Sequence, residues 1–214
     1  MIKQYITIFF LLLAVGVWGQ DVGSEQRVVY LIRHAKVDLQ TPALCFSKKA
    51  EAVHQKYDRS PIDDFDPVPV RQQIDDEPRI IYASTLPRAI ATAQILFPGA
   101  DSILLSHLFD EYDLSVISFP ILPLPYKAWT GLSRLMWILR LNKQDESRLQ
   151  AIRRMKLATN LLIELTQENK TTVLVAHGFL ISDMRRELKK RGWQVAANGG
   201  NKNLAVTKMI YEFR

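Results

Sequence analysis

The chain has 214 residues, of which 48% are hydrophobic and 23% charged. This composition excludes a disordered chain and is ordinary for a soluble globular protein with one sizeable domain. The net charge is +6, but the basic residues form no long tract apart from a run at 185–191. We interpret that run as a solvated helix face and expect no nucleic-acid partner. The single cysteine, Cys45, excludes an internal disulfide and a cysteine-cluster zinc site, and we predict a partly buried thiol.

The first 19 residues have the pattern of a secretory signal peptide. A short basic start at Lys3 precedes an apolar run that ends at Trp18, and a polar stretch follows Gly19. The alternatives are an uncleaved membrane anchor and a cytosolic N-terminus. The apolar run is shorter than the roughly 20 residues that span a bilayer. We therefore expect an extracytoplasmic protein, periplasmic or secreted, with residues 1–19 removed or retained as an anchor.

Predicted strands and helices alternate through the rest of the chain, 27–214, which we predict to be a single domain. The hydrophobic patterns place strands at 28–32, 79–83, 102–105, 171–176 and 204–213, and helices at 47–57, 84–96, 145–167 and 179–191. Ser47 and Ser84 are the predicted N-caps of the first two helices. The proline- and acid-rich stretch 61–78 is a predicted surface loop. This alternation predicts an α/β fold, a three-layer α/β/α sandwich around a mostly parallel sheet.

An insertion at about 115–143 interrupts the alternation. It contains three prolines, followed by Trp129, Met136 and Trp137. We predict a lid or helical cap over the core, in which these large side chains pack rather than bind a ligand. A peripheral contact with a membrane surface is the alternative for this segment.

Charged and polar side chains follow three of the predicted strands, in the order Arg33-His34, Ser84 to Arg88, and His177. Ligands of open α/β sheets bind at the carboxyl ends of strands, so two arginines and two histidines are expected at one edge. Guanidinium groups match phosphate oxygens, and a histidine with one unprotonated ring nitrogen can attack phosphorus. The second histidine can stabilise charge on the phosphoryl oxygens. The arginines supply positive charge, so we expect neither a metal nor another cofactor.

Transfer of a phosphoryl group from an ester also requires an acid that protonates the leaving oxygen. The segment 107–113, after the third predicted strand, contains three carboxylic acids. We choose Glu111 as the proton donor, with Asp110 and Asp113 as alternatives.

Three ordered motifs resemble those of the histidine phosphatase superfamily, also called the phosphoglycerate mutase-like family. They are 31–35 with its Arg-His-Ala, 84–93 with its Ser-x-x-x-Arg-Ala-x-x-Thr-Ala, and the late His-Gly at 177–178. Glu111 lies in a segment similar to the family's Leu-x-Glu, and Glu146 opens a segment similar to its Glu-Ser.

The resemblance implies a role for each motif residue. His34 would be the nucleophile that accepts the phosphoryl group, and Arg33 and Arg88 would bind phosphate. His177 would bind phosphate and stabilise the transition state, and Glu111 would be the proton donor.

We therefore predict a metal-independent phosphomonoester hydrolase that acts on a phosphorylated small molecule or macromolecule. The alternatives are a mutase-like phosphoryl transferase, a non-catalytic module that binds phosphorylated ligands, and a phosphatase of proteins or lipid-linked glycans at a membrane. The chain departs from many members at Lys36, a cation that either favours a more anionic substrate or faces solvent. The oligomeric state is left open.

Overall fold

The computed structural model describes residues 26–75, 78–119, 121–142 and 144–213, so the predicted signal peptide or anchor at 1–19 lies outside the described residues. The described strands form one sheet in the order β3-β2-β4-β1-β6-β5. Their bounds are β1 Gln26–Arg33, β2 Ile80–Ala83, β3 Ser102–Leu105, β4 Thr171–Ala176, β5 Gln194–Asn198 and β6 Val206–Glu212. Neighbours among β3, β2, β4 and β1 pair in parallel, whereas β6 is antiparallel to both β1 and β5. The predicted, mostly parallel sheet is therefore confirmed.

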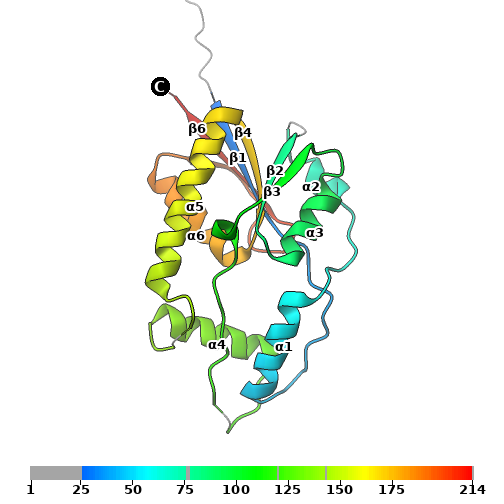
Figure 1. The fold of residues 1–214 in the computed structure, drawn as a ribbon, viewed down its shortest axis with the longest axis vertical. Coiled ribbons are helices and arrows are strands. Elements are labelled where there is room, and N and C mark those ends of the chain that lie inside the picture. The colour runs from blue at the N-terminus through cyan, green and yellow to red at the C-terminus, as the bar shows by residue number, and fades with distance from the viewer. Residues whose placement is uncertain (1–25, 76–77, 120, 143, 214) are drawn as a thin grey trace, which may run out of the picture.

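Both faces of the sheet are covered by helices (Figure 1). Alternate side chains of β1 point to opposite faces: Leu31 packs in the core beneath α5 and α6, and Ile32 in the core beneath α2 and α3. The helices are α2 Val68–Arg71, α3 Pro87–Leu96, α5 Arg148–Asn169 and α6 Gly178–Lys190. Because apolar residues of β1 enter both cores, the strand reads as a continuous hydrophobic run. The three-layer α/β/α sandwich is confirmed.

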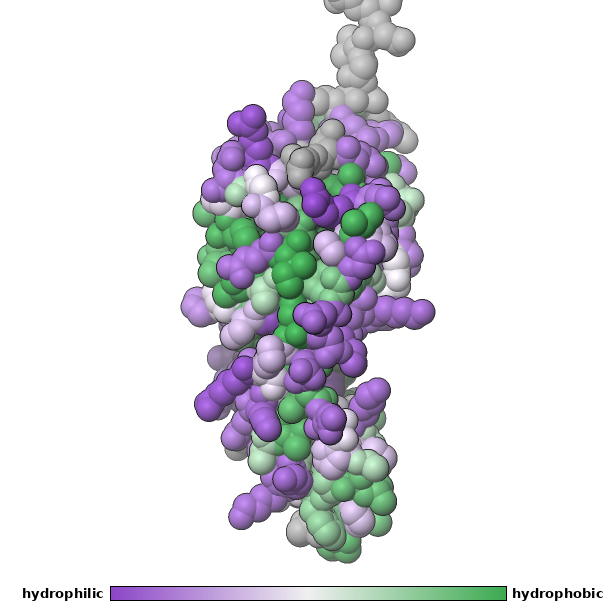
Figure 2. Space-filling view, turned by 90° about the vertical axis from the view of Figure 1, so that its right-hand side faces the viewer, coloured by the Kyte–Doolittle hydropathy of each residue, from purple (hydrophilic) through white to green (hydrophobic). Residues whose placement is uncertain are grey.

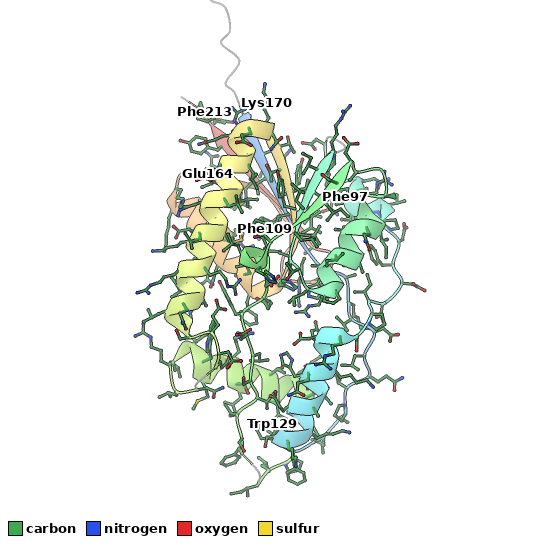
Figure 3. The ribbon with its side chains drawn as sticks, in the orientation of Figure 1. Phe97, Phe109, Trp129, Glu164, Lys170 and Phe213 are labelled. Atoms are coloured by element: carbon green, nitrogen blue, oxygen red, sulfur yellow. The ribbon has the colours of Figure 1, made fainter. Side chains whose placement is uncertain are left out.

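A third, smaller core joins α1 (Ser47–Arg59) to α4 (Tyr126–Ile138) at one end of the molecule. Trp129 is fully buried there, and its Nε1 donates a hydrogen bond to the carbonyl of Cys45 at 2.7 Å. Figure 3 shows Trp129 at this end, away from Phe97 and Phe109 in the sheet cores. Trp137 is buried in the core beneath α5 and α6. The tryptophans of the insertion therefore pack as predicted, and the buried thiol of Cys45 is also confirmed.

Local predictions failed where side chains serve tertiary contacts. Ser47 is the first residue of α1 rather than its cap, and its Oγ accepts a bond from the backbone N–H of Phe119. Ser84 does not cap α3, which begins at Pro87.

Strand β5 was not predicted because all five of its residues are exposed at the sheet edge, which leaves no burial pattern to detect. The helical turn α2 interrupts the predicted loop 61–78. Within the described ranges, no helix has the length and apolarity needed to cross a bilayer.

Candidate active site

The carboxyl ends of β1, β4 and β2 bring the predicted site residues together. These strands are adjacent in the sheet, and Arg33 is the last residue of β1. The backbone N–H of His34 donates to the carbonyl of Ala176 at 2.9 Å, and that of Ser84 donates to the carbonyl of Val175 at 3.1 Å. The rings of His34 and His177 lie with their centroids 5.0 Å apart. The expected cluster at one sheet edge is therefore present.

The hydrogen bond of His34 determines which ring nitrogen is free. Nδ1 lies 2.6 Å from the carbonyl oxygen of Ala35, which can only accept, so Nδ1 carries the proton. His34 is 3% exposed. Burial, followed by the nearby charge of Arg88 and then that of Arg33, lowers its pKa to about 3, although the bond to Ala35 opposes this shift. At neutral pH the ring is therefore uncharged, and Nε2 retains its lone pair.

His177 is oriented by a short chain of hydrogen bonds. Its Nε2 lies 2.7 Å from Ser84 Oγ, which in turn donates to a carboxylate oxygen of Asp110 at 2.7 Å. Because the single hydroxyl proton of Ser84 goes to Asp110, His177 must donate from Nε2. The ring is fully buried, and burial first and Arg88 second lower its pKa well below the usual value. Ser84 thus positions the second histidine.

Two guanidinium groups frame the histidines. Arg33 donates from Nη1 to the carbonyl of Asn201 and lies against Gly178, the first residue of α6. A Cβ at position 178 would come within 3.1 Å of both Cζ and Nε of Arg33, so a side chain there would crowd the guanidinium that glycine accommodates. Arg88, 4% exposed, approaches from α3. Two fixed cations therefore adjoin the ring of His34.

Several buried polar atoms of the cluster have no hydrogen-bond partner within the described part of the chain. They are Nε of Arg33, Nε of Arg88 and Nδ1 of His177. Buried polar groups are normally paired, and the two guanidinium Nε–H groups are donors, so they suit an acceptor-rich ligand. Nδ1 of the neutral His177 is an acceptor and would become a donor only on protonation. The N-terminus of α6 adds a further positive partial charge beside Arg33. The cluster therefore favours a compact anion such as phosphate.

An unpredicted carboxylate meets one of these cations. Asp58, near the end of α1, accepts a hydrogen bond from Nη1 of Arg88 at 2.9 Å. The Asp58 carboxylate also lies 4.0 Å from Nε2 of His54, whose Nδ1 is 3.1 Å from the hydroxyl of Tyr126 on α4. Burial lowers the pKa of His54, with Asp58 opposing the shift. Helix α1 thus brings an internal anion to the arginine that is predicted to bind phosphate.

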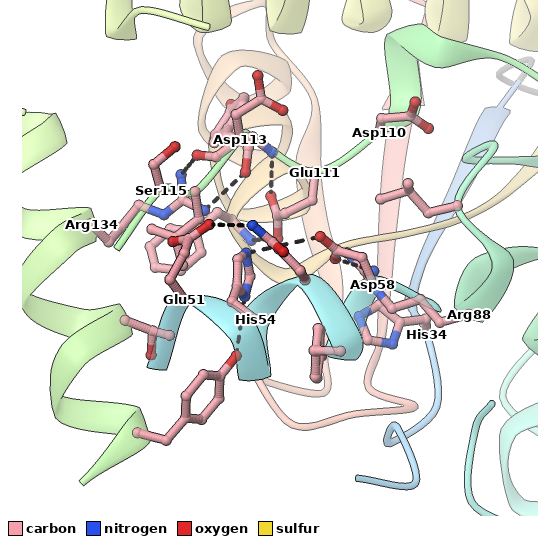
Figure 4. Close-up of a pocket in the computed structure, with 18 of the residues that line it drawn as sticks. His34, Glu51, His54, Asp58, Arg88, Asp110, Glu111, Asp113, Ser115 and Arg134 are labelled. Carbon is pink, nitrogen blue, oxygen red and sulfur yellow. Dashed lines mark hydrogen bonds and ion pairs between the residues drawn. The ribbon is translucent and has the colours of Figure 1, made fainter. Parts of the chain in front are cut away.

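His34, Arg33, Arg88 and Asp58 line a cavity of about 580 Å³ between the strand ends and helices α1 and α4 (Figure 4). Five residues of α1 line it. Four of them, Glu51, His54, Gln55 and Asp58, stand at positions i, i+3, i+4 and i+7 of one helix face, and Tyr57 is the fifth. That spacing is the signal in the sequence by which this wall could have been found. From α4, Arg134 donates to the carbonyls of Tyr112 and Asp113, and burial lowers its pKa.

The three candidate proton donors differ in their contacts. Asp110 accepts hydrogen bonds from Ser84 and Thr85 and contacts His107, so it serves the orienting chain. The Glu111 carboxylate accepts from the backbone N–H groups of Tyr112, Phe179 and Leu180, which fixes it at the N-terminus of α6. Burial, followed by the charge of Glu146, raises the pKa of Asp113. Glu111 and Asp113 both line the cavity with their side chains uncommitted to the histidines.

Arg154 of α5 supports the segment that carries these acids. It binds both carboxylate oxygens of Glu146 at 2.7 Å and donates to the carbonyl of Asp110 at 2.7 Å. Glu146 of the Glu-Ser motif is therefore held in place by Arg154.

Lys36 bonds to Asp63 with its side chain 73% exposed, so it faces solvent. Among the residues the structure describes, no group of three or more His, Cys, Asp or Glu side chains is arranged to hold a metal ion.

The structure is an α/β fold whose arginine–histidine cluster, at the carboxyl ends of its strands, has the charge and the donors that suit a phosphate-like anion. Residues 70–213 match the family described as the histidine phosphatase superfamily (branch 1). The match covers more than half of the chain, which therefore belongs to this superfamily. It includes Arg88, Glu111 and His177 and begins after Arg33 and His34. No curated protein sequence matches closely enough to count as a relative.

Solved structures share the fold at low sequence identity. A mycobacterial glucosyl-3-phosphoglycerate phosphatase in complex with VO3 has a TM-score of 0.54 and 21% identity, over 85% of this chain and 92% of the other. A phosphoserine phosphatase from Entamoeba histolytica, in complex with 3-phosphoglyceric acid, has a TM-score of 0.53 and 21% identity, over 85% and 89%. A mutant of that enzyme with phosphoserine has a TM-score of 0.51 and 20% identity, over the same shares.

Proposed function

We propose that the protein is a metal-independent phosphomonoester hydrolase that acts through a phosphohistidine intermediate on His34. The observation that carries this proposal is the state of the His34 ring. Nδ1–H is committed to the carbonyl of Ala35, while Nε2 is unprotonated in a buried cluster with Arg33 and Arg88. A neutral nucleophile beside two fixed cations suits attack on a phosphate ester.

The proposed reaction has two displacements at phosphorus. In the first, Nε2 of His34 forms a bond to phosphorus while the ester P–O bond breaks, and protonated Glu111 gives its proton to the leaving oxygen. In the second, water attacks the phosphohistidine, its proton passes to the Glu111 carboxylate, and the P–N bond breaks to release orthophosphate. Arg33 and Arg88 stabilise the charge on the phosphoryl oxygens in both steps. His177 is neutral in the free protein, and we expect a bound phosphate anion to raise its pKa, so that Nδ1 takes up a proton and donates to a phosphoryl oxygen.

A hydrolase is favoured over a mutase and over a non-catalytic binding module. The signal-like pattern at 1–19 supports an extracytoplasmic site of action, where a mutase would lack its phosphorylated primer and substrates. A non-catalytic binding module has no need of a free nucleophilic nitrogen or of the chain that orients His177. The cavity volume is in the range of small-molecule sites. We therefore infer a phosphorylated small molecule as substrate, which agrees with the small phosphorylated compounds in the names of the similar phosphatases.

The reaction class is tested by phosphate release from a panel of phosphomonoesters, with and without EDTA. We expect hydrolysis to survive EDTA, because the arginines supply the positive charge. We also expect inhibition by orthovanadate, which mimics the pentacoordinate phosphorus of the transition state. Loss of activity in EDTA that returns with a divalent ion would contradict metal independence. Isomerisation of phosphoglycerate without phosphate release would favour the mutase.

The proton donor is tested by comparing leaving groups. For Glu111→Gln we expect the rate on an alkyl phosphate such as glycerol phosphate to fall on the order of 10²–10⁴-fold, the usual contribution of general acid catalysis. The loss should be much smaller with p-nitrophenyl phosphate, because p-nitrophenolate leaves without a proton. The measurement is kcat for both substrates.

Asp113→Asn is the matched variant for this experiment, since Asp113 lines the same cavity and carries the same functional group. We expect it to affect both substrates alike. If Asp113→Asn shows the dependence on leaving group and Glu111→Gln does not, then Asp113 is the proton donor.

A further inference from the structure

Helix α4 has apolar side chains on two opposite faces, one buried and one exposed. One side carries Trp129 and Trp137 into the cores, as expected of an amphipathic helix. The opposite side carries a second stripe that is exposed to solvent. It consists of Leu132, Leu135, Ile138 and Leu139, with exposures of 38, 50, 45 and 55%. The one charged residue between Lys127 and Arg140 is Arg134, which is buried and bonded to the carbonyls of Tyr112 and Asp113. The exposed stripe therefore carries no charge of its own, although a solvent-facing helix normally does.

The loops beside α4 extend this apolar surface at the same end of the molecule. Phe119 donates its N–H to Ser47 Oγ, and Cys45 forms a β-bridge with Leu124, so the segments around 44–46 and 119–124 lie together. Their exposed side chains are Leu44, Phe46, Phe119, Ile121 and Leu122. We call these residues and the α4 stripe the cap tip. Figure 2 shows hydrophobic residues gathered at this end, opposite the end where the described chain enters β1.

The charge around the cap tip has one sign. The 29 residues 114–142 contain no Asp or Glu, although the whole chain has 22 acids in 214 residues. Four exposed cations border the surface: Lys48, Lys49, Lys127 and Arg140, of which Lys127 also lines the cavity. None of the four has an ion-pair partner in the described ranges. Apolar side chains rimmed by unpaired cations are complementary to an anionic, apolar-cored partner.

We propose that the cap tip docks on the surface of an anionic lipid bilayer. The aliphatic and phenyl side chains would enter the headgroup boundary, and the lysines and arginine would contact the anionic headgroups. A second copy of the chain is the other candidate occupant. A twofold interface would place the same surface against itself and bring Lys48, Lys49, Lys127 and Arg140 of both copies together. Like-charge repulsion disfavours that assembly, whereas lipid phosphates neutralise the same rim.

The docking is tested with an environment-sensitive fluorophore at the cap tip of the full-length chain. A single cysteine is introduced as Leu122→Cys in a Cys45→Ala background and labelled with a nitrobenzoxadiazole dye. The matched control is Glu164→Cys, an exposed position near the C-terminal end of α5 and far from the cap tip (Figure 3). We expect a blue shift and severalfold brightening of the Leu122→Cys label with phosphatidylglycerol-containing vesicles, and little change at Glu164→Cys. Vesicles of phosphatidylcholine alone should have a weaker effect.

This design separates the cap tip from the apolar run at 1–19, which is present in every variant. Vesicle binding without a signal at Leu122→Cys would assign binding to another segment and overturn the proposal. A shift that depends on protein concentration in the absence of lipid, with a doubled mass in sedimentation, would assign the surface to a second copy.

Removing one lysine charge at a time tests the electrostatic part of the proposal. Lys48→Gln and Lys49→Gln should each lower the vesicle partition coefficient on the order of fivefold. Both should leave hydrolysis of a soluble ester unchanged, because neither residue lines the cavity. Partitioning that is insensitive to both substitutions and to salt would contradict the electrostatic part of the proposal.

Discussion

Replacing His34 by Ala is expected to lower phosphate release on the order of 10⁴–10⁶-fold, the range seen when a catalytic nucleophile is removed. The physical reason is that Nε2 of His34 is the unprotonated ring nitrogen held beside Arg33 and Arg88. Without it, the ester has no covalent route, and water must attack in a single step. The measurement is a steady-state assay together with acid- and base-quench trapping of labelled phosphate on the protein.

The trapping experiment gives a chemical signature besides the rate. Phosphohistidine is labile in acid and stable in base, and this label should be present in the wild type and absent from His34→Ala. The matched control is His107→Asn. His107 does not line the cavity and its side chain is 88% exposed, so it cannot accept the phosphoryl group, although it contacts Asp110 of the chain that orients His177. We expect that control to retain the label. Undiminished phosphate release by His34→Ala would refute the nucleophile assignment.

Replacing Arg88 by Ala is expected to lower kcat/KM on the order of 10³–10⁵-fold, as with other arginines that stabilise a transferring phosphoryl group. Two losses combine in this variant. The phosphoryl oxygens lose a planar donor, and the carboxylate of Asp58 loses the cation to which it is bonded at 2.9 Å. Arg88→Lys should recover part of the activity, because it restores the charge but not the fork. The matched control is Arg59→Ala, an exposed residue at the end of α1, which should behave as the wild type.

The role of Asp58 follows from the same measurements. Asp58 and a bound phosphate are both anions that interact with Arg88, so Asp58→Asn should tighten inhibition by orthophosphate by several-fold. In the Asp58→Asn background, Arg88→Ala should cost less than it does alone, because no stranded carboxylate then faces the phosphate. Equal costs in both backgrounds would show that Asp58 and Arg88 act independently. Weaker phosphate inhibition in Asp58→Asn would instead show that Asp58 holds Arg88 in position.

Much of the fold and of the catalytic cluster could be predicted from local patterns. Apolar runs such as 171–176 are too short and too continuous for surface helices, and their alternation with helices implies parallel strands. Once the strands are parallel, residues that follow them must meet at one edge. Arg33, His34, Arg88 and His177 were therefore placed together without knowledge of the tertiary structure, and the structure brings them within one site.

Other features were decided only by tertiary packing. The polar face of α1 looks the same in sequence whether it meets water or a cavity, because periodicity reports which side of a helix is polar and not what covers it. Asp58 and Arg88, 30 positions apart, become partners only when α4 and α1 close over the strand ends. Ser84 resembles a helix cap but instead joins His177 to Asp110, since the carboxylate that accepts its proton lies 26 residues away. The sequence by itself determined which arginines and histidines meet at the strand ends, because parallel strands share one edge, and the tertiary structure decided what surrounds them.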